Sequence, residues 1–464
     1  MFRKASILSI AIIWVWSVFH FTLDIQATGL ENPFLVKTYQ WLFLMILSLI
    51  CLGLFILLSR GLPRKFVTIL GAGVSAATLF FQIMSPMGIS SDYYRYIWQG
   101  RISNGGQDNY SLVPWAAGVE KANKELFERM DWRDARSVYP PLAEQYFRLP
   151  AAIFDSSLFK YMSFRARLSL SRIPNLALYL LCGYLIYRLS RRRLYGFVWL
   201  ALPLFQFELV NSAHVDVLSI ALVLGALLAT KAKSWQSHVL VGALVAAAGM
   251  VKLTPFVLIL PIAAYILVNY SLKRLVALLA TFVSVTAVFS GPFLANDFAL
   301  VTRISYWLSG KEFSFGNPMY EISKRAAGNF GVTLLRLLTI GSLALIMVRI
   351  IKVIRDRRMD YDQMLGFCLA LLLLPFIAAP IVLPWYWVMP LTVIFLLRHN
   401  YSQAGIWALS TICVLLVLQY ADRAVDTSKA TRDYVIFSSS LILYISIAIV
   451  YRKMLARKLG SNEA

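Results

Sequence analysis

The sequence predicts an all-α protein that crosses a membrane many times. Of its 464 residues, 59% are hydrophobic and only 15% are charged, whereas soluble domains carry about 25% charged residues. Apolar runs of near membrane-spanning length recur along the chain, and they are too many to share one soluble core. We therefore predict one integral membrane domain over residues 1–464, a bundle of about 12–14 transmembrane helices.

The net charge of +22, from 45 basic and 23 acidic residues, has a specific distribution. In a soluble protein such an excess would suggest nucleic-acid binding. Here much of it lies in short clusters between apolar runs, as the positive-inside rule requires. We therefore predict membrane lipids as partners and no nucleic acid.

Each predicted crossing is an apolar run bounded by charged residues. The first run follows Arg3-Lys4 and fits an uncleaved anchor better than a signal peptide, with cleavage after Ala27 as the alternative. The pairs 196–230 and 238–270 contain short runs, so each pair is either two crossings or a hairpin that crosses only partly. The predicted crossings are residues 6–23, 39–58, 66–86, 173–188, 196–213, 216–230, 238–252, 254–270, 275–295, 331–350, 363–380, 384–398, 405–420 and 434–451.

Lysine and arginine clusters predict the orientation, because cytoplasmic loops carry the excess of these residues. The clusters put both termini in the cytoplasm of a cell whose inner (plasma) membrane holds the protein. The opposite side then carries a large extracytoplasmic loop, residues 87–172, and a second one, residues 296–330. The clusters are Arg3-Lys4, Arg60/Arg64/Lys65, Arg188 with Arg191–Arg193, Lys231/Lys233, Lys273-Arg274, Arg349 through Arg358, and Arg452 through Lys458.

The large loop is polar and rich in acidic residues. Residues 117–130 have the charge mixture of a surface helix. Residues 157–171 interleave apolar and basic side chains, which is typical of a helix lying in the membrane interface. The four cysteines fall inside apolar segments, with no Cys-x-x-Cys spacing, so we predict neither disulfides nor a thiolate metal site.

Asp92 is the first candidate for chemistry, since it follows a predicted crossing closely and lies near a membrane face. Two interpretations are about equally supported by its spacing: a helix cap or a catalytic carboxylate. On a helix that begins there, Asp92, Arg95, Tyr96 and Gln99 share one face. Arg95 and Arg101 could hold a phosphate through forked hydrogen bonds, or they could anchor the loop to lipid head groups.

Tyr139 and Glu144 close the polar part of this loop. Tyr139 precedes Pro140-Pro141, which predicts a rigid entry to the next segment. Glu144 follows within one helical turn and could contact substrate or simply solvate a helix face.

Further polar residues interrupt later apolar runs. His214 and Asp216 lie between 196–213 and 216–230, preceded by Glu208 and Asn211. Ionisable groups at membrane depth are costly unless paired or functional. They predict either a polar turn at the outer surface or a sugar or phosphate contact beside Asp92.

Lys252 stands alone among apolar residues, and Trp385 lies in a Trp-Tyr-Trp run after Pro384. A snorkelling lysine and an interfacial aromatic belt are the ordinary explanations. A lysine facing a lipid phosphate, and an indole stacked on a sugar, are the functional ones.

Several stretches together resemble bacterial GT-C superfamily glycosyltransferases, integral membrane enzymes that use polyprenyl-phosphate sugars. The mannosyltransferase-like branch is the most similar. The stretches are SDYYRYIWQGR (91–101), YPPLAE (139–144), NSAHVDVLSIALVLGALL (211–228), AAAGMVKLTPFVLILP (246–261) and LPWYWVMPL (383–391).

The resemblance implies a GT-C-like helical bundle in which Asp92 is the catalytic base. It implies transfer of a hexose, mannose-like, from a polyprenyl-phosphate sugar to a lipid or glycan acceptor hydroxyl outside the cytoplasm. The chain departs from the family by reading Trp98-Gln99-Gly100 for Trp-Asp-Gly and Asp108-Asn109-Tyr110 for Asn-Pro-Tyr. These departures concern the sugar or acceptor more than the reaction class.

Our hypothesis is therefore inverting glycosyl transfer, with Asp92 as general base. Arg95, Arg101, Lys252 and His214 are the candidates for stabilising the leaving phosphate. We expect no cofactor, assign no metal, and leave a divalent ion open. A transporter or flippase of lipid-linked saccharides, and a polymerase or ligase of them, are the rival classes. A transporter predicts polar residues through the bilayer midplane, and product length separates a polymerase from a single transfer.

Overall fold

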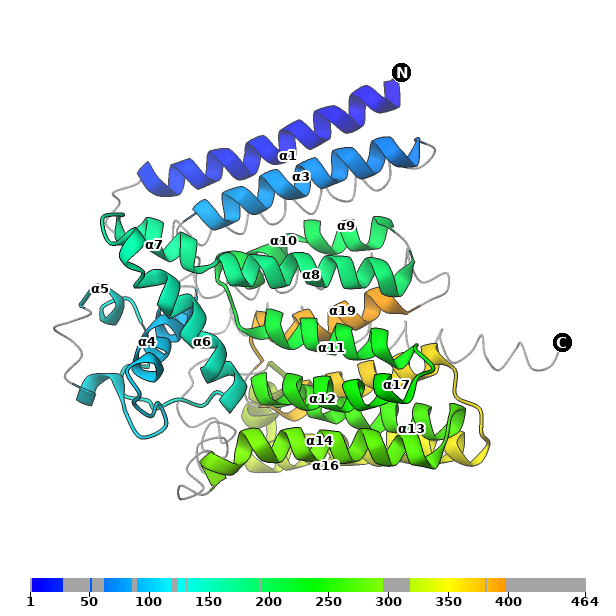
Figure 1. Cartoon of the computed structure of the whole chain (residues 1–464). Coiled ribbons are helices and arrows are strands. Elements are labelled where there is room, and N and C mark those ends of the chain that lie inside the picture. Colours follow the sequence, from blue (N-terminus) through cyan, green and yellow to red (C-terminus); the bar gives the residue numbers. More distant parts are fainter. Residues whose placement is uncertain are drawn as a thin grey trace.

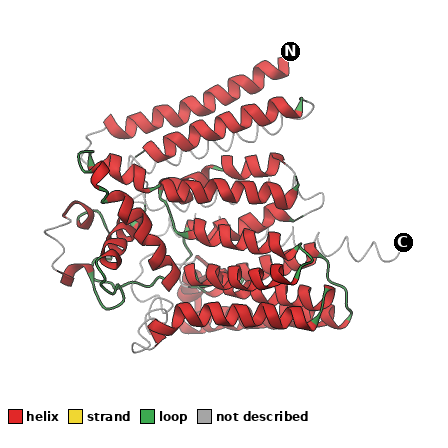
Figure 2. Cartoon of the chain, in the orientation of Figure 1, coloured by secondary structure: helices red, strands yellow, loops and turns green. Residues whose placement is uncertain are grey.

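In the parts of the chain that the computed structural model describes, every regular element is helical and no strand occurs (Figure 2). The all-α prediction is therefore confirmed for them. The described residues are 2–27, 51, 62–85, 90–117, 124–130, 132–191, 193–294, 318–379 and 382–397.

The molecule consists of a bundle of nearly parallel helices and a cap that lies across one end of it (Figure 1). The described bundle elements are α1 (Phe2–Ala27), α3 (Arg64–Met84), α8 (Ile173–Ser190), α9 (Arg193–Ala201), α10 (Pro203–Gln206), the π-helix η3 (Phe207–Asn211), α11 (Asp216–Thr230), α12 (Trp235–Val251), η4 (Thr254–Leu258), α13 (Ile259–Asn269), α14 (Leu272–Leu294), α16 (Pro318–Arg355), α17 (Tyr361–Leu373), α18 (Pro375–Ala378), η5 (Pro384–Trp387) and α19 (Val388–Leu396). The cap contains α4 (Asp92–Asn104), η1 (Pro114–Ala117), α5 (Lys124–Phe127), α6 (Pro141–Phe154), η2 (Ser157–Phe159) and α7 (Phe164–Ser171).

Five described helices are long and apolar enough to cross a membrane: Lys65–Met84, Phe164–Ser190, Leu272–Gly291, Ala326–Arg355 and Tyr361–Ala378. A sixth candidate is the pair Pro203–Asn211 and Asp216–Ala229, which bends by 114°. The chain is thus a polytopic helical membrane protein, as predicted. The count of 12–14 crossings stays a prediction, since the runs 405–420 and 434–451, and 39–58 apart from Cys51, lie outside the described residues.

One segment of the predicted outer loops differs from expectation. Residues 157–171 are not one interfacial helix: η2 is a single turn, and the helix that begins at Phe164 joins α8 as one candidate span. The Ser163 side chain caps this helix by accepting a hydrogen bond from the Ala166 N–H, at 3.3 Å. In the second predicted loop, 296–330, α16 begins at Pro318 and is kinked at Ala327 and Gly328. The bounds of this loop stay a prediction.

The connections at the two ends of the bundle differ in composition. The connections α8–α9, α11–α12, α13–α14 and α16–α17 lie at the end far from the cap (Figure 1). These connections carry most of the basic clusters, among them Lys231, whose ammonium donates to the Leu189 carbonyl at 2.8 Å. The end under the cap carries the η3–α11 turn, Lys252 and the start of η5.

The cap is packed tightly within itself and onto the bundle. A Cβ atom on Gly100 of α4 would lie 2.1 Å from the Phe147 carbonyl oxygen of α6, so only glycine allows this helix crossing. Tyr96 stacks on Phe147 with ring centroids 4.3 Å apart. The Tyr146 hydroxyl donates to Asn175 of α8 at 2.8 Å. These contacts fix α4, and hence Asp92, against the bundle.

Candidate active site

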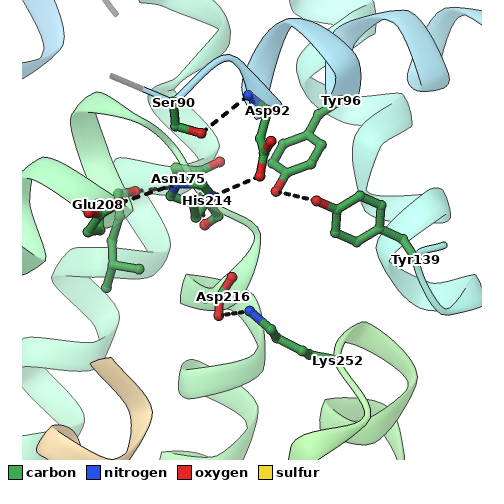
Figure 3. A network of polar contacts seen from close by, with 10 residues as sticks. Ser90, Asp92, Tyr96, Tyr139, Asn175, Glu208, His214, Asp216 and Lys252 are labelled. Atoms are coloured by element: carbon green, nitrogen blue, oxygen red, sulfur yellow. Dashed lines mark hydrogen bonds and ion pairs between the residues drawn. The ribbon is translucent and has the colours of Figure 1, made fainter. Parts of the chain in front are cut away.

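Polar side chains from five separate segments meet where the cap contacts the bundle (Figure 3). Asp92 and Tyr96 come from α4, and Tyr139 comes from the segment before α6. His214 and Asp216 come from the turn that opens α11, Glu208 comes from η3, and Lys252 directly follows α12. Seven of the sequence-predicted site residues therefore lie at this end of the bundle: Asp92, Tyr96, Tyr139, His214, Asp216, Lys252 and Trp385.

Asp92 is the first residue of α4 rather than its cap. Ser91 occupies the cap position, without a capping hydrogen bond from its side chain, and the Asp92 N–H donates to the Ser90 hydroxyl at 3.3 Å. The helix dipole stabilises an anion in this first turn. About a fifth of the Asp92 side chain is exposed, and its Oδ2 lies 3.7 Å from Nδ1 of His214. The carboxylate is thus held at the junction and still open to solvent.

Two phenols line the site beside Asp92. The hydroxyls of Tyr96 and Tyr139 are 3.0 Å apart, and the Tyr110 hydroxyl donates to the Tyr139 carbonyl at 2.6 Å. Burial raises the pKa of both phenols well above the ordinary value, and the negative charge of Asp92 raises it further. Both phenols therefore stay neutral hydrogen-bond donors at physiological pH.

His214 is completely buried between two acids. Its Nδ1 faces Asp92, and its Nε2 lies 3.2 Å from Oε2 of Glu208, which is also fully buried. The imidazole stacks on the indole of Trp385 with centroids 3.9 Å apart and planes 19° apart. The ring is thus enclosed on both edges and one face.

Lys252 provides the ammonium group of the site. It forms an ion pair with Asp216, and it lies 4.1 Å from the centroid of the Tyr386 ring. About a quarter of the Lys252 side chain is exposed, against 8% for Asp216. The lysine can therefore meet an anion from outside while the acid behind it balances its charge.

The structure does not bring the two predicted phosphate-binding arginines into this cluster. The Arg95 guanidinium donates to the carbonyls of Trp132 and Ala135 within the cap. Arg101 pairs with Asp155 through two hydrogen bonds. Arg95 shares a helix face with Asp92, but its long side chain is held by these two carbonyls of the cap.

Gln99 and Glu144 also serve the interior of the cap. Gln99 is buried, and its backbone carbonyl accepts a hydrogen bond from the Asn109 side chain at 2.9 Å. Glu144 accepts hydrogen bonds from Asn109, at 2.6 Å, and from Ser137. Burial raises the pKa of the Glu144 carboxyl to about 7, against the lowering effects of Ser137, Asn109 and Arg95. This acid holds Asn109 and Ser137 against α6.

Sequence reasoning missed the residues that support the site from behind. Arg172 is fully buried and donates to the carbonyls of Asn211 (3.0 Å) and Ser85 (2.9 Å). Asn175 donates to the carbonyl of His214 at 3.1 Å. A charged residue inside an apolar helix would have indicated a role for Arg172. The predicted segments 157–171 and 173–188 instead placed Arg172 between two helices. For Asn175 no such signal exists.

Within the described residues, no group of three or more His, Cys, Asp or Glu side chains is arranged to hold a metal ion.

The fold and the site define a helical membrane protein with ionisable groups gathered at one end of its bundle, under a folded cap. Residues 39–269, about half of the chain, match the family described as alpha-(1->6)-mannopyranosyltransferase, N-terminal domain. Over this segment the chain belongs to that mannosyltransferase family, and the protein is a glycosyltransferase. No curated protein and no solved structure matches the chain. The matched segment includes every site residue described above except Trp385 and Tyr386.

Proposed function

We propose that the protein transfers a mannosyl group from a polyprenyl-phosphate donor to a hydroxyl of a lipid or glycan acceptor, with inversion at the anomeric carbon. The observation that carries the proposal is that one cluster at the end of the bundle contains both a partly exposed carboxylate, Asp92, and a partly exposed ammonium, Lys252. Such a transfer needs a base at the attacking oxygen and a cation at the leaving oxygen.

Asp92 is the base in this mechanism. Its carboxylate takes the proton from the acceptor hydroxyl as that oxygen forms a bond to the anomeric carbon. The bond between the anomeric carbon and the donor phosphate breaks in the same step, and the bonding electrons leave with the phosphate. The neutral phenols of Tyr96 and Tyr139 lie beside Asp92 and can donate hydrogen bonds to sugar hydroxyls.

Lys252 is the group that meets the leaving phosphate. Its ammonium is a compact point charge and stabilises the negative charge that grows on the phosphate oxygen. Tyr386, whose ring lies against this ammonium, limits where the side chain can swing. Arg95 and Arg101 have no part in this proposal, since cap carbonyls and Asp155 occupy them.

The cap is proposed to lie outside the cytoplasm, which fits a lipid-borne donor. The support is the concentration of lysine and arginine in connections at the opposite end of the bundle. A cysteine introduced at exposed Ser157 of the cap should react with a membrane-impermeant maleimide in intact cells. A cysteine at exposed Lys233, at the other end, should react only after the membrane is opened.

Replacement of the base tests the reaction. Membranes that contain Asp92→Asn should transfer labelled mannose from a polyprenyl-phosphate donor at least ~100-fold more slowly than the wild type. Asp155→Asn, which removes an acid from the cap surface, is the matched control and should keep wild-type transfer. Full activity of Asp92→Asn would refute the proposed mechanism, and a ladder of products instead of one added sugar would indicate a polymerase.

A further inference from the structure

We propose that His214 is a positioning residue for Asp92, held in a chain Glu208–His214–Asp92, and that it does not contact substrate. The inference rests on the proposed function, because it takes Asp92 to be the catalytic base. It assigns to a buried part of the bundle the task of orienting the carboxylate that reacts.

The environment of the imidazole leaves no room for a substrate group. His214 is 0% exposed, and each ring nitrogen faces a different carboxylate, at 3.7 Å for Asp92 and 3.2 Å for Glu208. Trp385 covers one face of the ring at 3.9 Å between centroids. Of the chain Glu208–His214–Asp92, only Asp92 is open to solvent, so the acceptor reaches the chain through Asp92 alone.

The backbone around His214 is built to bring these three side chains together. Ala213 adopts a left-handed conformation, with φ of +51°, which non-glycine residues rarely take. This turn returns the chain onto the π-helix η3, so the His214 N–H donates to the carbonyl of Glu208 at 3.0 Å. π-helical turns and strained residues of this kind occur frequently at functional sites. The same turn that joins the two backbones places the His214 ring beside the Glu208 carboxylate.

A second element locks the turn from behind. Asn175 of α8 donates to the carbonyl of His214 at 3.1 Å and accepts a hydrogen bond from Tyr146 of the cap at 2.8 Å. The position of the imidazole is therefore tied to the bundle and to the cap that carries Asp92. A shift of the cap would move Asp92 and its partner together.

The chemical advantage lies in the two different oxygens of Asp92. His214 lies beside Oδ2, with 3.7 Å between this oxygen and Nδ1, and so limits how the carboxylate can rotate. A carboxylate with one oxygen fixed reacts from one orientation, which is the benefit of a preorganised base. Glu208 lies 3.2 Å from the other nitrogen, in the place where catalytic triads have the third group that orients the ring.

Conservative replacement of the two buried members tests the inference. His214→Gln should lower kcat by about 10- to 100-fold while the donor KM stays within about twofold, because substrate binding does not use the ring. Glu208→Gln should act in the same direction with a smaller effect. The double variant should be no slower than His214→Gln alone, because the two residues act through one chain.

The pH dependence of the rate separates positioning from mere folding support. The proposal places a proton on Nδ1 of His214, the nitrogen that faces Asp92. Its loss disfavours the ionised form of Asp92, so the acid limb of the kcat profile should move to higher pH in His214→Gln. Other charged or titratable groups around the site are Asp216, Lys252, Tyr96, Tyr139 and Tyr386, and all of them are unchanged in this variant.

His238→Gln is the matched control. His238 is also completely buried, but it lies on α12 near the other end of the bundle, against Tyr270. It should leave kcat and the acid limb unchanged. If His214→Gln does not fold, Glu208→Gln carries the same two readouts.

Three outcomes would overturn the inference. One is a raised donor KM with unchanged kcat in His214→Gln, which would make the ring a substrate contact. Another is wild-type kcat in both His214→Gln and Glu208→Gln while Asp92→Asn is inactive. This result would refute the positioning role and leave the proposed function of Asp92 intact. The third is full activity of Asp92→Asn, which removes the proposed function and this inference with it.

Discussion

The buried acid of the cap, Glu144, makes the stability of the cap depend on pH. Its side chain accepts hydrogen bonds from Ser137 and Asn109 and is only 3% exposed. Burial raises the pKa of this carboxyl from 4.5 to about 7. The folded cap therefore prefers the neutral acid, whereas the unfolded segment ionises freely above pH 4.5.

The sign and size of the effect follow from this difference. For an acid whose pKa is raised by folding, stability is greatest below the unfolded pKa and falls as pH rises to the folded pKa. The loss occurs between about pH 4.5 and pH 7 and is constant above that. A difference of about 2.5 pKa units corresponds to about 3 kcal/mol, at 1.36 kcal/mol per unit.

Glu144→Gln should abolish this loss, since an amide stays neutral. Its oxygen can accept from Asn109, and its NH2 group can donate to the Ser137 hydroxyl, which then becomes the acceptor. We expect the opening free energy of α6 to fall by about 2.5 kcal/mol between pH 5 and pH 8 in the wild type, because part of the total loss lies below pH 5. Hydrogen exchange of the protein in nanodiscs, corrected for intrinsic rates, measures this free energy. In the Gln variant it should change little. Glu128→Gln is the control, because Glu128 is an exposed acid of the same cap.

The reasoning is refuted if α6 of the Gln variant is less protected than the wild type at pH 8. It is also refuted if wild-type protection does not fall across this interval. Either result would mean that the ionised form of Glu144 is the one that the folded cap needs.

Three more changes probe the site and its scaffold. Arg95→Gln should lower the opening free energy of the cap by about 3 kcal/mol, since two charge-assisted hydrogen bonds are lost, and should leave the donor KM unchanged in a transfer assay. Lys252→Met should reduce kcat by about 100-fold and destabilise the protein in denaturant titration, because it leaves Asp216 buried without a cation. Adding Asp216→Asn should restore the stability but not the rate. Ala213→Gly should keep activity within about twofold, whereas Ala213→Val should lose most of it, because a β-branched residue resists positive φ.

Each of these changes has a result that contradicts its basis. A raised donor KM in Arg95→Gln would indicate that Arg95 binds the donor phosphate, which is one of the two roles that the sequence left open. Wild-type kcat in Lys252→Met would remove the cation from the mechanism. Equal rates for the Gly and Val variants at position 213 would show that the left-handed turn has no influence on Asp92.

The fold class and the location of the site were predictable because both depend on short-range signals. Apolar runs of membrane-spanning length follow from the thickness of the bilayer, and basic clusters mark one end of each run. Asp92, His214, Lys252 and Trp385 each lie at the other end of such a run. Helices that alternate in direction must bring those ends together, so the meeting of these residues under the cap is a consequence of topology.

The partners of each residue were not predictable, because they depend on side-chain reach across the folded chain. Arg95 lies one turn from Asp92 in sequence, yet its guanidinium binds carbonyls 37 and 40 residues away. For Trp385 the sequence left two roles open, an interfacial belt or a stack on a sugar; the indole is 7% exposed and stacks on His214. Tyr386, the next residue, is the aromatic group against Lys252. Trp385 therefore packs behind the site on His214, while its neighbour Tyr386 contacts Lys252 within the site.

Under the proposed mechanism, the charge balance of the site explains why a single lysine suffices for an anionic donor. Three acids (Asp92, Glu208 and Asp216) face one ammonium and one imidazole, so the empty site has no surplus of positive charge. Asp216 makes the Lys252 ammonium tolerable at membrane depth, where an unpaired ion would be costly. A donor phosphate that arrives at Lys252 has to share that ammonium with Asp216, so the ground state gains little. The greater gain comes when the bond to the sugar breaks and the phosphate acquires its second charge, which is the interaction that raises kcat and not merely affinity.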